Sequence, residues 1–207
     1  MNRKILLATR NAHKTGEVRA ILGDGWIVED LLTHPELPEV EETGTTFAEN
    51  AALKALAGSG HFPDGWVIAD DSGLEVDALG GAPGGISARY AGPEADDEAN
   101  RQKLVRELRA VLVPGSGCAP AARFRCNIAV ARGGELVGQF DGAVEGMVIP
   151  AVRGEGGFGY DPMFIPAGYQ DTFAELPAEV KNRLSHRGKA LAQAVEFLER
   201  VAMEAGE

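Results

Sequence analysis

The chain has 207 residues, a formal net charge of −11 and only two cysteines. This length suits one domain with a sizeable hydrophobic core. So few cysteines argue against a disulfide framework or a cysteine metal site and favour a reducing cytoplasm. The acidic balance excludes an extended basic surface for nucleic acid or anionic lipid. A small phosphate-bearing molecule remains compatible, because it needs only a few local cations or a metal ion.

Strand and helix patterns alternate in the first half of the chain, which predicts an α/β core. The first apolar run is too short for a signal peptide or a membrane span and reads as a strand. The expected elements are a strand at 4–9, a helix near 12–22, a helix near 46–58, a strand at 66–70 and a helix at 96–112.

The second half changes to a period of two. Alternating apolar residues at 124–130 and the segment 135–140 flank Gly133-Gly134, which predicts a β-hairpin, and 143–149 adds another strand. The last helix is expected to begin near Ser185. The sequence therefore predicts a single α/β domain over residues 1–207, a mixed β-sheet flanked by helices, in two lobes with a central cleft. Both cysteines, Cys118 and Cys126, are expected to be ordinary packing or loop residues.

Two adjacent carboxylates follow the strand at 66–70. Asp70 and Asp71 come at its C-terminal end, where α/β sheets place ligands, and Gly73 is expected to turn the chain. Because an isolated buried carboxylate is very costly, a divalent cation would be a suitable partner for this pair. The alternative is that both are solvated turn residues or cap a helix.

The segment after the first strand is suited to binding an anion. Thr9-Arg10-Asn11-Ala12-His13-Lys14 opens the helix near 12–22, so backbone N–H groups, a positive helix end and Lys14 would face a phosphate. Alternatively, Asn11 only caps the helix, Lys14 is solvated and His13 is a surface residue.

Further carboxylates, Glu41-Glu42, precede a helix whose start is marked by Thr46 and Glu49, spaced as a capping box. Magnesium takes carboxylate oxygens from separate segments together with substrate phosphate oxygens. Glu42 with Asp71 could supply the carboxylates, although the sequence does not distinguish Glu41 from Glu42.

Two glycine-rich segments do not match classical nucleotide loops. The segment 154–159 has the G-x-G-x-x-G pattern but leads into Tyr160-Asp161-Pro162, which cannot begin the long helix of a dinucleotide fold. The segment 80–85 lacks the Gly-Lys-Ser/Thr ending of a P-loop. Instead, glycines at 154–159 could let backbone approach a ligand while Phe158 or Tyr160 faces a planar base; the alternative is a hairpin corner with a core aromatic.

A donor-rich segment, 181–189, stands out in this acidic chain. His186 and Arg187 would lie in the first turn of the last helix, where cations oppose the helix dipole unless an acceptor is near. A ligand carbonyl or phosphate would be such an acceptor, and a surface cationic turn is the alternative.

Together these segments closely resemble the inosine triphosphate pyrophosphatase family, the non-canonical purine nucleoside triphosphate pyrophosphatases. The resemblance spans nearly the whole chain, with Arg10 standing where many bacterial members have a small residue. It rests on motifs at 9–14, 42–51, 69–74, 82–92, 157–162 and 185–188 in the same order.

The resemblance implies magnesium-dependent hydrolysis of inosine, deoxyinosine and xanthosine triphosphates to the monophosphate and pyrophosphate, by a cytoplasmic homodimer. It implies that Asp71 is the proton acceptor and a metal ligand, and that Glu42 is the second metal ligand. Substrate contacts are implied for Thr9, Arg10, Asn11, Ala12, His13, Lys14, Ser72, Phe158, Gly159, Tyr160, Asp161, Lys181, His186 and Arg187.

On this hypothesis water attacks the α-phosphorus while Lys14 and Lys181 neutralise the departing pyrophosphate. Donors from His186, Arg187 or nearby backbone would meet the 6-oxo group of the base, which adenine lacks.

Two rival functions are a related pyrophosphatase acting on modified pyrimidines and a nucleotide sensor without turnover.

Overall fold

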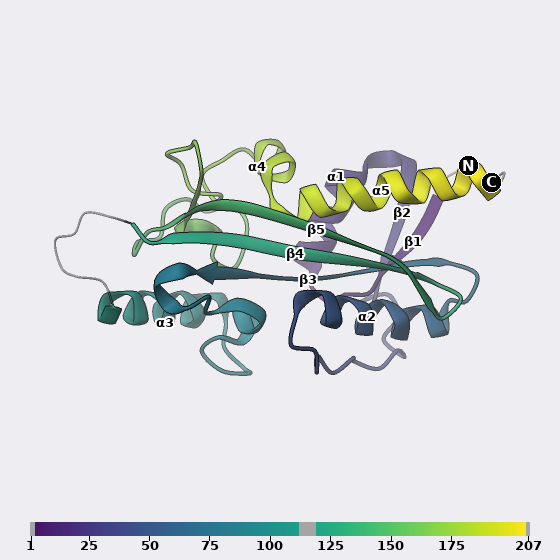
Figure 1. Ribbon diagram of the computed structural model, residues 1–207, viewed down its shortest axis with the longest axis horizontal. Helices are drawn as coiled ribbons and strands as arrows, with labels where there is room; N and C mark the ends of the chain where they lie inside the picture. Colours follow the sequence, from purple (N-terminus) through teal and green to yellow (C-terminus); the bar gives the residue numbers. More distant parts are fainter. Residues whose placement is uncertain (1–2, 112–118, 206–207) are drawn as a thin grey trace. The chain divides into compact units, whose positions relative to one another are not determined.

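The computed structural model describes residues 3–111 and 119–205, which form a mixed α/β structure (Figure 1). Within these residues one six-stranded sheet has the order β2-β1-β3-β4-β5-β6. β1 is parallel to β2 and β3, whereas β5 and β6 are antiparallel, so the predicted mixed sheet is confirmed. The strands are β1 (Arg3–Leu7), β2 (Trp26–Asp30), β3 (Trp66–Val76), β4 (Ala121–Arg132), β5 (Glu135–Val148) and β6 (Phe164–Pro166).

The described helices flank these strands, and none of them is both long and apolar enough to cross a bilayer. They are α1 (Ala12–Leu22), α2 (Phe47–His61), α3 (Asp97–Val111), α4 (Ala178–Leu184) and α5 (His186–Ala205). Short 3₁₀ turns lie at Gly23–Gly25, Asp77–Leu79, Gly84–Arg89 and Asp161–Met163.

The chain divides into two compact units, in keeping with the two lobes predicted from the sequence. The central cleft expected with these lobes stays a prediction. The first unit comprises Met1–Asp71, Cys126–Gly142 and His186–Glu207. Because successive side chains of a strand point to opposite faces, its strands carry two separate cores. One core joins Ile5, Leu7, Ile68, Ile128 and Val130 to Val18 of α1 and Leu191 of α5. The other joins Leu6, Ala8, Val67, Ala69 and Ala129 to Ala51 and Ala55 of α2.

The second unit comprises Ser72–Arg125 and Ala143–Ser185 and has its own aromatic core. The ring of Phe164 lies 4.8 Å from that of Phe124 and 5.1 Å from that of Phe173, measured between centroids. Leu104 and Leu108 of α3 are fully buried against this cluster, whereas Val111 near the end of the same helix is exposed, so only part of the apolar face expected for this helix belongs to the core.

Gly73, expected to turn the chain, and Gly142, between the segments expected at 135–140 and 143–149, both lie inside strands. β3 continues through Gly73 to Val76, and β5 runs unbroken through Gly142, so the expected turn at Gly73 and the separate strand at 143–149 were wrong. A Cβ on Gly73 would lie 2.3 Å from the carbonyl oxygen of Gly84. Gly73 therefore permits a close backbone approach instead of a turn.

Other predictions were confirmed or need extension. Thr46 caps α2 in a capping box: its hydroxyl accepts from the Glu49 N–H, and the Glu49 carboxylate accepts from the Thr46 N–H. Ser185 directly precedes α5, as expected, but it also ends α4, a helix too short to show periodicity. The five-residue strand β2 was missed as well.

The cysteine prediction is confirmed for Cys126, which is buried in the first unit, and burial raises the pKa of its thiol to about 12. Cys118 lies outside the described residues.

Candidate active site

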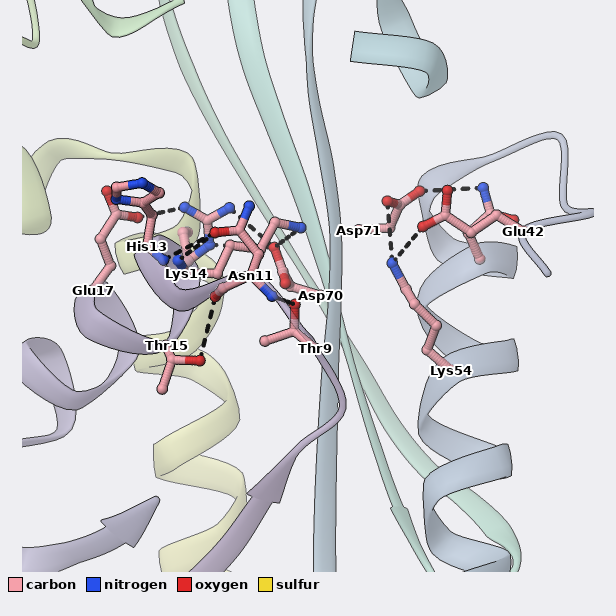
Figure 2. Close-up of polar contacts among 12 residues, drawn as sticks. Thr9, Asn11, His13, Lys14, Thr15, Glu17, Glu42, Lys54, Asp70 and Asp71 are labelled. Carbon is pink, nitrogen blue, oxygen red and sulfur yellow. Dashed lines mark hydrogen bonds and ion pairs between the residues drawn. The ribbon is translucent and has the colours of Figure 1, made fainter. Parts of the chain in front are cut away.

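Asp70 and Asp71 lie on opposite faces of β3. Asp70 follows the alternation of Ile68 and so faces α1 and α5, whereas Asp71 follows that of Ala69 and faces α2. Figure 2 shows Asp70 beside Lys14 and Asp71 beside Lys54, on the two sides of the strand. The two residues are only 3% and 5% exposed, so the alternative of solvated turn residues was wrong.

A lysine joins the predicted metal-binding carboxylates. Lys54 Nζ lies 2.9 Å from Glu42 Oε1 and 3.3 Å from Asp71 Oδ1. Asn50, one turn earlier on α2, donates to Asp71 Oδ2 at 3.2 Å and accepts from the Gly44 N–H at 2.8 Å. Asn50 therefore ties the loop that carries Glu42 to the carboxylate on β3.

The charges in this first cluster shift the acidities of its members. Burial raises the pKa of Asp71, and the opposing Lys54 cation only partly offsets this effect. Burial alone would lower the pKa of Lys54, but the carboxylates of Asp71, Asp70 and Glu42 outweigh it and raise the pKa. Lys54 therefore stays charged, and Asp71 is a stronger base than an ordinary carboxylate.

On the other face of β3, Asp70 binds two cations. Its Oδ2 lies 3.0 Å from Lys14 Nζ and 3.0 Å from Arg187 Nη2, with Arg187 Nε at 3.2 Å. Arg187 Nη1 also pairs with Glu17 of α1. Arg187 and His186 are 2% and 6% exposed, so the alternative of a surface cationic turn was wrong.

Side chains next to the N-terminus of α1 cap that terminus, so the anion site expected there stays a prediction. Asn11 caps the helix, since its Oδ1 accepts from the N–H groups of His13 at 2.9 Å and Lys14 at 3.2 Å. Thr9 Oγ1 accepts from the Asn11 N–H at 3.2 Å, and Figure 2 shows these residues next to Asp70. The exposed turn 11–13 and Lys14 thus carry positive charge to this end of β1.

The side chain of Arg10 does not point toward Asp70 but toward the chain that follows β2. Its guanidinium donates to the carbonyl oxygens of Leu31 and Leu37, and so fixes the chain that follows β2. The side chain of Arg10 is therefore structural in this arrangement, although its backbone belongs to the same segment as Thr9 and Asn11.

In the second unit, the predicted nucleotide-binding segment surrounds Asp161. Asp161 Oδ2 accepts from the Phe158 N–H at 2.9 Å and from Lys181 Nζ at 2.6 Å. Lys181 Nζ also lies 5.3 Å from the centroid of the Phe158 ring, within the range of a cation–π contact. The structure therefore brings together Phe158, Asp161 and Lys181; Gly159 and Tyr160 belong to the same loop, and Ser72 is the half-buried residue after Asp71.

Several contributors were not assigned a role from the sequence. Lys54 and Asn50 lie four residues apart, so they share one face of α2. That spacing, behind the capping box, was a readable signal for a polar face on an alanine-rich helix. Glu17 pairs with Arg187 across 170 residues of sequence, and no local signal predicts such a partner.

The donor set beside Lys54 fits magnesium. Within the described residues no group of three or more acidic, histidine or cysteine side chains gathers in the way a closed metal cage would require. Magnesium, however, is usually held by one or two carboxylates, with substrate phosphates and waters completing its shell. Glu42 and Asp71 already direct their oxygens at one cation, the Lys54 ammonium, and Glu41 is exposed.

These features define a class of protein. Asp70 and Asp71 lie just beyond the C-terminal end of β1, the parallel neighbour of β3, beside the N-terminus of α1. An acidic cation site next to such a terminus is typical of α/β proteins that act on phosphate-bearing ligands.

The chain belongs to the Ham1 family, whose model matches residues 5–197, and the predicted resemblance is confirmed. A relative from Desulforamulus reducens, named dITP/XTP pyrophosphatase, is 48% identical over 199 residues and covers 96% of both chains. A relative of the same name from Halalkalibacterium halodurans is 47% identical over 195 residues, covering 94% of this chain and 98% of its own. The structure of a HAM1 protein from Coxiella burnetii matches with a TM-score of 0.83 and 37% identity, covering 96% of this chain and 99% of the other.

Proposed function

We propose that this protein is a nucleoside triphosphate pyrophosphatase that converts inosine, deoxyinosine and xanthosine triphosphates to the monophosphate and pyrophosphate. The observation that carries the proposal is the meeting of Glu42 and Asp71 at one buried cation, the Lys54 ammonium. The substrate class is supported by the name dITP/XTP pyrophosphatase, which relatives nearly half identical to this chain carry.

Asp71 is the proposed proton acceptor. The attacking water bonds to the α-phosphorus, the bond from that phosphorus to the bridging oxygen breaks, and the water's proton passes to the Asp71 carboxylate.

Glu42 and Asp71 would hold magnesium, which supplies positive charge against the phosphate oxygens when it is bound. Lys54 balances the two carboxylates in the absence of ligand. Because its ammonium stays charged, it can also neutralise a phosphate oxygen once a ligand is present.

Lys14 and the N-terminus of α1 are the proposed phosphate-binding elements of the first unit. Asp70 Oδ2 keeps the two hydrogen bonds from Arg187 Nε and Nη2 when Lys14 turns away from it, so the lysine can reach a phosphate without leaving that carboxylate unpaired. The positive end of the α1 dipole adds to the charge of Lys14, and a phosphate could replace Asn11 Oδ1 as the acceptor of the His13 and Lys14 N–H groups.

Phe158, with Lys181 beside its ring, is proposed to contribute to nucleotide recognition in the second unit, together with Ser72, Gly159, Tyr160 and Asp161. Base choice follows from hydrogen bonding: a site that donates to a 6-oxo group is left with an unmatched donor when adenine presents an amino group. His186 and Arg187 remain the proposed donors, with the added finding that Arg187 is already engaged by Asp70 and Glu17.

A homodimer and a cytoplasmic location are proposed on the family resemblance, the second also on the low cysteine content. Neither nucleic acid nor a membrane is a proposed partner, in view of the formal charge of −11.

The decisive assay measures pyrophosphate and orthophosphate separately, with magnesium, for inosine, xanthosine, guanosine and adenosine triphosphates. We expect pyrophosphate from the inosine and xanthosine substrates, and an Asp71→Asn variant slower by about 10²- to 10⁴-fold. Asp24→Asn, at an exposed position, is the matched control and should retain full activity. Tight binding without pyrophosphate release would make the protein a sensor, and preference for modified pyrimidine triphosphates would change the substrate class.

A further inference from the structure

The loop that carries Phe158 is hydrogen-bonded to the first turns of α3. Gly159 donates its N–H to Asp97 Oδ2 at 2.6 Å, and its carbonyl oxygen accepts from Arg101 Nη1 at 2.8 Å. Asp97 and Arg101 are four residues apart, so they lie on one face of α3. Two side chains of opposite charge thus hold the backbone on both sides of one residue.

The backbone at this point needs such support. Gly157 and Gly159 have φ values of 71° and 60°, in the left-handed region that other residues rarely adopt. A Cβ on Gly157 would lie 2.1 Å from Asp161 Oδ2, the oxygen that accepts from the Phe158 N–H. Glycine is required there for the loop to close around Asp161, but glycine also leaves the backbone free to move when nothing holds it.

The remaining contacts fix the neighbours of Phe158. Tyr160 donates its hydroxyl to the Ser87 carbonyl oxygen at 2.9 Å, and Asp161 holds the Phe158 N–H. Within residues 3–111 and 119–205, the hydrogen bonds to Gly159 itself come from the pair on α3. These two contacts lie immediately after Phe158 and therefore restrict the direction in which its half-buried ring points.

We propose that Asp97 and Arg101 are positioning residues that hold the Gly159 backbone and so keep Phe158 oriented for the nucleotide; this rests on the proposed function. Neither side chain is assigned to the chemistry or to direct contact with the substrate. Their contribution is preorganisation: the loop is ordered before the ligand arrives, and binding does not have to order it. Hydrogen bonds that involve a charged side chain are stronger than neutral ones, which suits them to this task.

The test is a double-mutant cycle between Arg101→Met and Phe158→Ala, read as KM and kcat for inosine triphosphate and as Kd for a non-hydrolysable inosine triphosphate analogue. We expect Arg101→Met to raise KM and Kd about tenfold, with kcat changed less than about threefold. In the Phe158→Ala background the same substitution should change Kd by less than about twofold, because the residue it positions is gone. Arg106→Met, an exposed arginine on the same helix, is the control and should match the wild type.

Equal effects of Arg101→Met with and without the Phe158 side chain would overturn the proposal, as would an effect no larger than that of Arg106→Met. If Arg101→Met fails to fold, Asp97→Ala, which removes the acceptor of the Gly159 N–H, replaces it in the cycle with the same expectations. If the wild type releases no pyrophosphate, the proposed function fails. The Kd values of the cycle then still decide whether the pair on α3 acts through Phe158.

Discussion

Replacing Asp70 by asparagine should be among the most destabilising single changes in the first unit. The substitution keeps the shape of the side chain but removes the charge that compensates Lys14 and Arg187, which lie 3.0 Å away. Because Asp70 is 3% exposed, water cannot replace the lost carboxylate. Breaking a buried ion pair typically costs about 3 to 5 kcal/mol, and the remaining Glu17 contact to Arg187 places the effect near the lower value, about 3 kcal/mol.

The assay is thermal unfolding at pH 7.5, followed by circular dichroism or calorimetry. For a chain of this length each 1 kcal/mol shifts Tm by about 2 to 4 °C, so Asp70→Asn should lower Tm by about 6 to 12 °C. Asp24→Asn, an exposed change of the same chemistry, should shift Tm by less than about 2 °C.

The pH dependence gives a second readout. Burial alone would raise the pKa of Asp70, but the Lys14 and Arg187 cations outweigh it and hold the pKa well below its usual range. A lowered pKa means that the stabilisation is complete above the unfolded pKa of about 3.9 and is lost as pH falls through the folded pKa. The Tm gap between wild type and variant should therefore be constant from pH 8 to about pH 5 and narrow only at more acid pH. A loss below about 2 °C at pH 7.5, or a gap that widens toward acid, would refute this reasoning.

Three further experiments test other parts of the structure. Lys54→Met leaves two carboxylates without their shared cation, so magnesium alone should raise the Tm of this variant more than that of the wild type; equal shifts would contradict the cation site. Gly142→Ala would place a Cβ 2.0 Å from the His186 carbonyl oxygen and should cost about 3 kcal/mol in urea unfolding, whereas Gly60→Ala, with open space around it, should be neutral or slightly stabilising. The Cys126 thiol, whose pKa is about 12, should resist iodoacetamide at pH 8 until urea is added, as peptide mass spectrometry would show; rapid labelling of the native protein would argue against its burial.

Much of the site was predictable because its signals are local. The cap at Thr46, the start of α1 at Asn11 and the apolar strand before Asp70 each depend on residues within one or two turns, and each is present as predicted. The period of two in a strand even implies that Asp70 and Asp71 point in opposite directions.

Only the tertiary structure decided what those two carboxylates face. That α2 brings Lys54 to Asp71, and that α1 and α5 bring Lys14 and Arg187 to Asp70, depends on contacts between segments up to 117 residues apart. Gly142 also shows that local sequence does not reveal tertiary partners. It lies between two segments expected as separate strands, yet glycine is required there because the backbone of α5 packs against it and leaves no room for a Cβ. A residue's neighbours along the chain fix its local conformation, whereas its partners across the fold are chosen by packing, and packing gave each acid its separate environment.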